Sequence, residues 1–281
     1  YKKQGPHHSY GGPAYYIQTA LKQNWLATLF ASVLILTYMG GFNLLASFNV
    51  ADAFTHYSWA NEWTPWIIGA ILAVLMAGSI FGGTRRLTDV TGLLVPVMAI
   101  IYLGVGLVVV ALNYQNIPAM FSAIFAGAFD FPAIFGGFAG SAMMYGIKRG
   151  LYSNEAGVGS APNAAASASV SHPAKQGLVQ MLSVFIDTMV ICTLTAFVVL
   201  SSGVGEDGGV TGAPLVKDAM ATVLGQPVAQ VFISVALFLF AFTTLVGNFY
   251  YAEVNFRFLL RNKHMKHWML SIFRAVAALL V

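Results

Sequence analysis

The chain has 281 residues, of which 58% are hydrophobic and only 9% are charged, and its mean hydropathy is +0.73. Soluble domains carry charge on about a quarter of their residues, so this composition excludes an ordinary soluble protein and predicts an integral membrane protein. The formal net charge of +4 does not indicate nucleic-acid binding, because Lys and Arg in a membrane protein mark the cytoplasmic side of the bilayer. The single cysteine, Cys192, excludes a disulfide framework.

A short helix is predicted before the first apolar run. Residues 11–13 (Gly-Gly-Pro) break the chain and favour a helix start, and apolar side chains between residues 15 and 21 recur at helical spacing opposite Gln18 and Lys22. We interpret this amphipathic helix either as an anchor in the cytoplasmic membrane interface or as a gating element.

Apolar windows of about 20 residues, the length that crosses a bilayer, follow in chain order. The predicted spans are residues 25–50, 66–84, 91–113, 135–151, 177–201 and 228–251, and a seventh span begins near residue 267. The predicted fold class is therefore an all-α integral membrane protein with about six complete transmembrane helices and part of a seventh. The chain starts at Tyr1 without a methionine, in a basic polar stretch, and its last apolar run has only about 15 residues where a span needs about 20. We therefore expect residues 1–281 to be one transmembrane domain that is incomplete at both ends.

The basic residues predict the topology. If the spans alternate in direction, twelve of the 14 Lys and Arg residues fall on one side, Lys217 falls on the other, and Arg274 lies inside the last span. By the positive-inside rule the N-terminus of the chain is cytoplasmic, and the segments 52–65, 114–134 and 202–227 are external loops. The twelve residues are Lys2, Lys3, Lys22, Arg85, Arg86, Lys148, Arg149, Lys175, Arg257, Arg261, Lys263 and Lys266.

The segment 150–168, GLYSNEAGVGSAPNAAASA, interrupts the apolar pattern with Gly, Ala and Asn and contains the acid Glu155. Where a membrane helix gives way to Gly-rich backbone, the freed carbonyl and N–H groups can line a cavity and hold an ion or a small substrate. A transporter is therefore the first functional hypothesis. Glu155 and nearby Arg149 are interpreted as a gating pair or as an interfacial salt bridge.

Polar side chains also occur inside two predicted spans. Asp187 lies in an apolar run, where a carboxylate costs about 3 kcal/mol and must face protein or water. It is either an interhelical hydrogen-bond anchor, together with Thr188, or a group that coordinates an ion or a proton.

The second polar group is formed by Thr243, Thr244 and Asn248 in one helix. Thr244 and Asn248 are four residues apart, so two or three oxygens project to one side, as a dehydrated alkali cation requires. The alternative is that the hydroxyls bond back to the preceding turn of their own helix.

Four blocks of the sequence together resemble the alanine or glycine:cation symporter family, within the amino acid/polyamine/organocation superfamily. They are GGPAYYI (11–17), GIKRGLYSNEAGVGSAPNAA (146–165), FIDTMVICT (185–193) and FAFTTLVGNFYYAE (240–253), in the family's order. The resemblance implies sodium-coupled symport of a small neutral amino acid by alternating access on a leucine-transporter-type inverted-repeat fold. It further implies that the chain holds core helices three to eight and part of the ninth, in a multi-pass protein of the cell membrane, such as a bacterial inner membrane.

The resemblance also implies the site. The sixth core helix would contribute Gly146, Ile147 and Gly150 to substrate binding, and the eighth would contribute Thr244 and Asn248 to the substrate and Thr243 with Thr244 to Na⁺. The expected coupling or structural residues are Asn154, Glu155 and Asp187. Some members of the family carry tryptophan where this chain has Asn248, so the pocket is expected to admit glutamine as well as alanine or glycine.

Two other classes, an ion channel and a membrane-embedded enzyme, are the alternatives. A channel would place polar rings on several helices, and an enzyme would need a nucleophile with a base or a metal cluster at membrane depth, and neither pattern is evident in the sequence. The six histidines lie in predicted loops without metal-ligand spacing, and the glycine-rich loop at 203–212 lacks the Lys-Ser pair of a phosphate-binding loop. We therefore expect no enzyme, no cofactor, no metal other than Na⁺ as coupling ion and no nucleic-acid partner.

Overall fold

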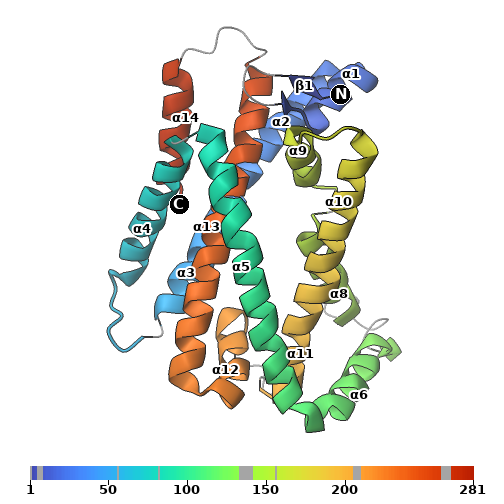
Figure 1. Cartoon of the computed structure of the whole chain (residues 1–281), viewed down its shortest axis with the longest axis vertical. Coiled ribbons are helices and arrows are strands. Elements are labelled where there is room, and N and C mark those ends of the chain that lie inside the picture. The colour runs from blue at the N-terminus through green and yellow to red at the C-terminus, as the bar shows by residue number, and fades with distance from the viewer. Residues whose placement is uncertain are drawn as a thin grey trace. The chain divides into compact units, whose positions relative to one another are not determined.

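A computed structural model describes residues 2–4, 9–55, 57–81, 83–132, 142–155, 157–204, 210–260 and 267–281. These residues are almost entirely helical (Figure 1), which confirms the predicted all-α class. Within them, the strands are β1 (Lys3–Gln4) and β2 (Ser9–Tyr10), which pair as a two-residue antiparallel ribbon.

The helices carry the labels of Figure 1. They are α1 (Pro13–Ala20), α2 (Asn24–Leu36), α3 (Asn43–Thr55), α4 (Thr64–Phe81), α5 (Gly83–Leu112), α6 (Ile117–Ala128), α8 (Ala142–Asn154), α9 (Ser160–Ser167), α10 (Pro173–Phe185), α11 (Cys192–Ser202), α12 (Ala213–Leu224), α13 (Gln226–Leu259) and α14 (His267–Leu279). Two π-helical turns, η1 (Thr37–Phe42) and η4 (Ile186–Ile191), join α2 to α3 and α10 to α11 without a break. A 3-10 turn, η2 (Tyr114–Asn116), precedes α6.

Five of the predicted spans coincide with helices that are long and apolar enough to cross a membrane. These helical stretches are Asn24–Thr55, Thr64–Phe81, Thr91–Leu112, Pro173–Ser202 and Gln226–Leu259, and Trp268–Leu279 is a shorter apolar helix at the predicted seventh span. Of the remaining predicted span, 135–151, residues 135–141 lie outside the described residues and the rest belongs to α8. The described parts of the predicted spans are helical because lipid offers no partner to backbone N–H and C=O groups, which a helix satisfies internally.

Helix α5 begins at Gly83, so Arg85 and Arg86 belong to a helix that extends beyond its apolar part. Two expectations about loops were wrong. The segments expected as external loops contain α6 and α12, which are short helices with apolar faces. His267, expected in a loop, begins α14; part of the loop at 203–212, residues 205–209, lies outside the described residues, as do His7, His8, His56 and His264.

The chain divides into two compact units. Unit 1 comprises Tyr1–Ala99, Val158–Gln176 and Ser234–Val281, and unit 2 comprises Ile100–Gly157 and Gly177–Ile233. Helices α5, α10 and α13 each begin in one unit and end in the other.

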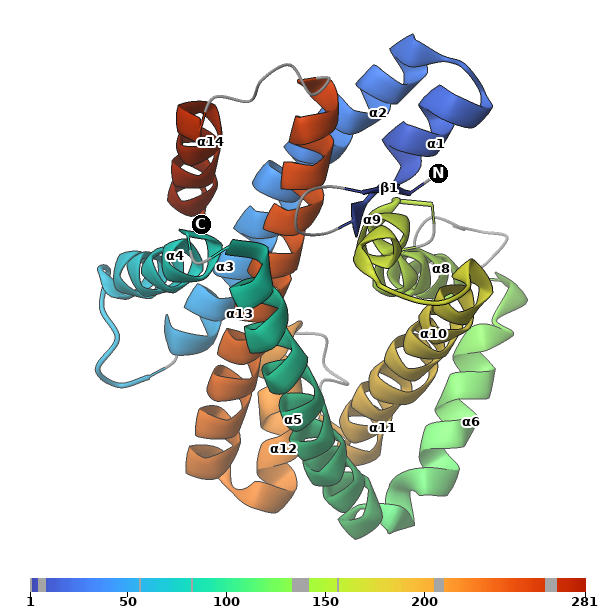
Figure 2. The same cartoon turned by 45° about the horizontal axis from the view of Figure 1, so that its top comes forward.

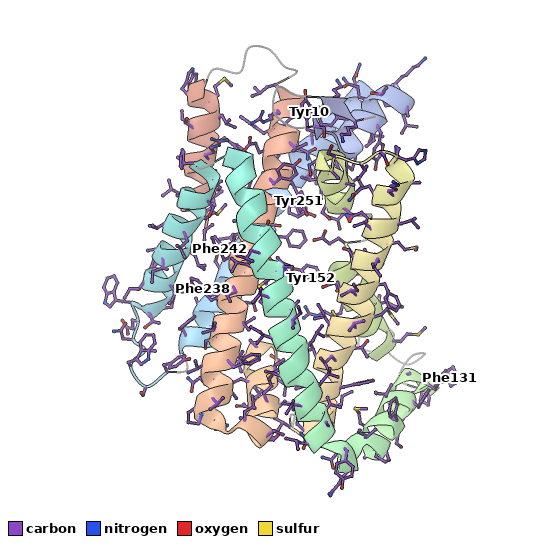
Figure 3. The ribbon with its side chains drawn as sticks, in the orientation of Figure 1. Tyr10, Phe131, Tyr152, Phe238, Phe242 and Tyr251 are labelled. Atoms are coloured by element: carbon purple, nitrogen blue, oxygen red, sulfur yellow. The ribbon has the colours of Figure 1, made fainter. Side chains whose placement is uncertain are left out.

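The core of unit 1 is formed by α3, α4, α13 and α14. Helices α4 and α14 lie side by side (Figures 1 and 2), and Phe256 of α13 stacks on Phe273 of α14 with ring centroids 4.3 Å apart. Phe242 of α13 is buried in this core and Phe238, one turn earlier, packs against it (Figure 3). The buried members of the core are Met39, Val50, Ile68, Leu72, Met76, Ile80, Ala241, Phe242, Leu245, Val246, Phe249, Ala252, Phe273 and Ala277.

The predicted short helix is α1, and it packs on α13. Its first residue is Pro13, which follows Gly12 at φ +139°. The Tyr15 hydroxyl donates a hydrogen bond to the Val254 carbonyl at 3.3 Å, and the Tyr15 ring meets Phe258 edge-on at 5.0 Å. Burial raises the pKa of Tyr15 above that of a free phenol. Helix α1 is therefore held by protein contacts as well as by its amphipathic character.

The Gly-rich segment breaks the helix, as predicted. Helix α8 ends at Asn154, Glu155 has φ +54°, and α9 begins only at Ser160. Gly157 and Gly159 have φ of +80° and +98°, a region that favours glycine because it has no Cβ. Helix α9 then packs against β2 (Figure 2).

Gly159 is constrained by packing as well as by conformation. A Cβ there would lie 2.7 Å from the Phe30 ring and 2.9 Å from Pro13 Cγ, whereas a Cβ at Gly157 would meet no described atom within 4 Å. We expect Gly159→Ala to destabilise the protein by about 2 to 5 kcal/mol, since overpacking adds to the cost of a left-handed residue. Gly157→Ala is the matched control and should cost only about 1 to 2 kcal/mol. Thermal unfolding in detergent measures both, and equal effects would contradict the packing argument.

Candidate functional site

The predicted site residues are distributed over both units. Thr243, Thr244 and Asn248 are on the part of α13 that belongs to unit 1. Those of α8 and η4, together with Glu155, belong to unit 2.

Asn248 takes part in a buried amide pair. Its Nδ2 donates a hydrogen bond to Oδ1 of Asn43 at 3.0 Å, although 205 residues separate the two positions. Asn43 is the first residue of α3, directly after the π-helical turn η1. Both side chains are almost completely buried, at 0% exposed for Asn43 and 4% for Asn248. Sequence analysis found Asn248 but missed Asn43, whose only signal was a polar residue inside an apolar span.

The two threonines have different surroundings. The Thr243 hydroxyl donates to the Phe240 carbonyl of its own helix at 2.9 Å, which is the local bond foreseen as the alternative to cation binding. Thr243 is buried and Thr244 is exposed. Because a hydroxyl oxygen that donates one bond keeps its lone pairs, Thr243 can still accept or coordinate.

A second amide pair in unit 1 holds α13 against α9. Asn255 Nδ2 donates to Asn163 Oδ1 at 3.3 Å, and Asn163 Nδ2 donates to the Gly159 carbonyl at 2.7 Å. Gly12 closes over this pair, since a Cβ there would lie only 2.0 Å from Asn163 Oδ1. Asn255 is seven residues after Asn248, so the two amides share one face of α13, a spacing that sequence analysis overlooked.

The arginine inside the last predicted span is paired. Arg274 of α14 lies 3.6 Å from Oε2 of Glu253, which is only 3% exposed. Arg257, one turn along α13, bonds to Oε1 of the same carboxylate. A carboxylate between two guanidinium groups makes these charges tolerable near a membrane.

In unit 2, Asp187 links two helical elements. The Ser153 hydroxyl of α8 donates to Asp187 Oδ2 of η4 at 2.8 Å and also lies 3.2 Å from Cys192 Sγ. The sequence analysis expected Asp187 to act in an interhelical hydrogen-bond anchor together with Thr188, and the hydrogen bond that Asp187 makes comes from Ser153. The Thr188 hydroxyl, expected to assist, is buried and has no partner among the described residues.

The remaining predicted residues of unit 2 lie along α8. Gly146, Ile147 and Gly150 occupy its middle, Asn154 is its last residue, and Glu155 follows immediately. A Cβ at Gly146 or Gly150 would meet no described atom within 4 Å, so packing within the described part of the chain does not require glycine at either position.

The described residues contain no group of three His, Cys, Asp or Glu side chains placed to hold a metal ion. The predicted site residues of unit 1 carry neutral hydroxyl and amide groups (Thr243, Thr244 and Asn248), and among them Asn248 bonds to a side chain of another element, that of Asn43. Neutral oxygens of this kind suit an alkali cation or a polar organic ligand better than a transition metal.

Several long apolar helices, a helix broken at Gly-rich backbone and amide pairs buried between helices define an α-helical multi-pass membrane protein of the transporter class. The whole chain, residues 1–281, matches the model of the sodium:alanine symporter family. The chain belongs to this family. The resemblance inferred from the four sequence blocks is thereby confirmed, and the family is one of symporters rather than enzymes.

Three relatives show how the match extends. The chain is 44% identical over 272 residues to "Amino-acid carrier protein AlsT" of Bacillus subtilis, covering 96% of this chain and 56% of the relative. It is 40% identical over 255 residues to "Probable sodium/glutamine symporter GlnT" of the same organism, covering 91% and 52%. It is 36% identical over 270 residues to "Sodium/alanine symporter AgcS" of Methanococcus maripaludis, covering 93% and 58%. The chain thus spans about half the length of these curated relatives.

The contact between Ser153 and Asp187 can be tested by a double-mutant cycle. We expect Ser153→Ala and Asp187→Ala each to lower the unfolding temperature, and the double substitution to lower it by less than the sum, because both remove the same bond. Ser202→Ala is the control, since both bonds of the Ser202 hydroxyl are local: it donates to the Val199 carbonyl of its own helix and accepts from the Val204 N–H two residues later. Additive effects of Ser153→Ala and Asp187→Ala would show that the two side chains are not coupled.

Proposed function

We propose that this chain is the larger part of a sodium-coupled symporter that carries a small neutral amino acid across the cell membrane by alternating access. The proposal rests on the match of the whole chain to the sodium:alanine symporter family. It is supported by relatives whose names state sodium/alanine or amino-acid transport. Uptake of this kind needs no cofactor, and Na⁺ is the coupling ion.

The proposed fold is the leucine-transporter-type inverted repeat, with α8 as the sixth core helix and α13 as the eighth. The helix break between Asn154 and Ser160 supports this assignment, because discontinuous helices in such folds present backbone groups to substrate and ion. On the same assignment, residues 1–281 form one transmembrane domain within a longer transporter.

The proposed substrate site combines Gly146, Ile147 and Gly150 of α8 with Thr244 and Asn248 of α13. The two glycines support this role, since a ligand can approach backbone that no described side chain covers. Thr243 and Thr244 are proposed to contribute oxygens to Na⁺. Asn154 and Glu155 are proposed to act in coupling or in structure at the end of α8, and for Asp187 the bond from Ser153 favours the structural role.

Glutamine is proposed as a substrate beside alanine and glycine. Asn248 presents a compact amide where an indole would fill the pocket, and an amide can donate and accept hydrogen bonds. A relative named as a sodium/glutamine symporter, 40% identical to this chain, supports the same substrate.

The proposed orientation places the start of the chain in the cytoplasm, in a bacterial inner membrane. It predicts that the segment 202–227 is external and the segment 252–266 cytoplasmic. In a Cys192→Ser background, an impermeant thiol reagent applied to intact cells should modify a cysteine placed at Asp207 but not one placed at Asn262. The reverse pattern would overturn the orientation. Both positions lie outside the described residues.

The function is tested by uptake of labelled alanine into vesicles that contain the full-length transporter. An imposed Na⁺ gradient should drive accumulation of alanine above its equilibrium concentration, which a channel cannot do.

The sodium site is tested by a substitution in the same assay. Thr244→Ala should raise the Na⁺ concentration for half-maximal uptake more than it lowers the maximal rate at saturating Na⁺, because it removes one oxygen ligand of the ion. An unchanged Na⁺ dependence would remove Thr244 from the sodium site, and absence of gradient-driven accumulation would contradict symport.

A further inference from the structure

The amide pair Asn43–Asn248 is surrounded by polar groups that the described protein does not satisfy. Asn43 Nδ2 and Ser47 Oγ are buried, and neither has a hydrogen-bond partner among the described residues. Ser47 is four residues after Asn43, so both side chains project from the same face of α3. Asn248 reaches this face from α13.

Apolar side chains would satisfy packing at these positions without loss. The neighbouring core is built from residues such as Met39, Val50 and Leu245. A buried donor without an acceptor loses its bonds to water and recovers nothing, which is why such groups are rare in native proteins. Two such groups on one helix face, beside the buried amide of Asn248, therefore indicate a requirement other than packing.

The backbone next to the cluster is also irregular. Asn43 directly follows the π-helical turn Thr37–Phe42, which inserts extra residues into an otherwise continuous span. Such turns occur frequently at functional sites, because they re-aim side chains relative to a regular helix.

The hydrogen-bonding pattern matches one kind of ligand. The Asn248-to-Asn43 bond leaves the Asn43 N–H groups and the Ser47 O–H as donors without a described partner. The Asn248 amide oxygen takes no part in that bond and is an acceptor by its chemistry. A primary amide pairs with this set, since its carbonyl accepts from the donors and its NH₂ donates to the oxygen. An ammonium or alkali cation does not pair with it, because Asn43 Nδ2 can only donate.

We infer that Asn43, Ser47 and Asn248 form a specificity site for the side-chain amide of a glutamine-like substrate. This inference rests on the proposed function and assigns to α3 two residues that the sequence-based site did not include. When glutamine binds, its side-chain amide forms hydrogen bonds with Asn43, Ser47 and Asn248. A substrate with an apolar side chain of the same length cannot form these bonds. Discrimination therefore depends on polarity as well as on size.

The test is competition against labelled alanine in vesicles containing the full-length transporter. Unlabelled glutamine and norleucine are the competitors, because they are similar in length and differ in the amide. Ser47→Ala should weaken competition by glutamine about three- to tenfold relative to competition by norleucine, the effect of one lost neutral hydrogen bond. Since the Ser47 hydroxyl has no described protein partner, the substitution does not disturb folding. Asn43→Leu should weaken competition by glutamine by about tenfold or more relative to competition by norleucine.

Ser79→Ala is the matched control. Ser79 is buried to the same degree, at 7% exposed against 8% for Ser47, but its hydroxyl bonds to the Leu75 carbonyl of its own helix. It should leave the ratio of glutamine to norleucine unchanged. If Ser47→Ala and Asn43→Leu also leave this ratio unchanged while alanine uptake persists, the inference fails, and the cluster binds only water. Absence of Na⁺-driven alanine uptake in the unaltered transporter would instead overturn the proposed function, and this inference with it.

Discussion

The constraint on which this structure depends is the absence of hydrogen-bond partners in lipid. Each backbone N–H and C=O group at membrane depth must find its partner inside the protein, and a helix provides it within a single segment. Long apolar runs therefore become helices, and a break such as the one between Asn154 and Ser160 has to be covered by other parts of the chain. Part of that cover is visible in unit 1, where Asn163 bonds to the Gly159 carbonyl and Phe30 and Pro13 close over Gly159.

The same constraint explains how the polar side chains are arranged. Asn248 pairs with Asn43, Asn255 with Asn163, Glu253 with two arginines, and Asp187 with Ser153. Apart from the pair of Glu253 with Arg257 inside α13, each of these contacts joins two different helical elements. In an apolar medium a lone amide or carboxylate is costly, so the polar residues of the spans are also the residues that fix which helices are neighbours.

The spans could be predicted from the sequence because their signal is local. A window of about 20 apolar residues is sufficient, and the start of α1 after Gly12 and the break after Asn154 were predicted from glycine and proline. The π-helical turns were not predicted, because TYMGGF and IDTMVI lie inside long apolar runs, each of which predicts one continuous helix. Helices α6 and α12 were missed because 12 residues are too few to register as a span.

The site was less predictable than the fold because its residues are defined by their partners. Thr243, Thr244 and Asn248 were found by their spacing within one helix, but Asn43 and Ser47 are distinguished only by what they face across the core. Sequence spacing cannot show that Asn43 lies against Asn248 across 205 residues. Likewise, the sequence shows Arg274 as an isolated charge in an apolar helix, and only the structure shows that it pairs with Glu253.

Helix α13 carries several of these polar contacts in unit 1. Within about two turns it bonds to α3 through Asn248, to α14 through Glu253 and to α9 through Asn255. The contacts differ in strength, since a neutral amide bond contributes about 1 kcal/mol net and a bond between charged groups about twice that. In unit 1, α13 is therefore held to α3 and α9 by neutral amide bonds and to α14 by an ion pair.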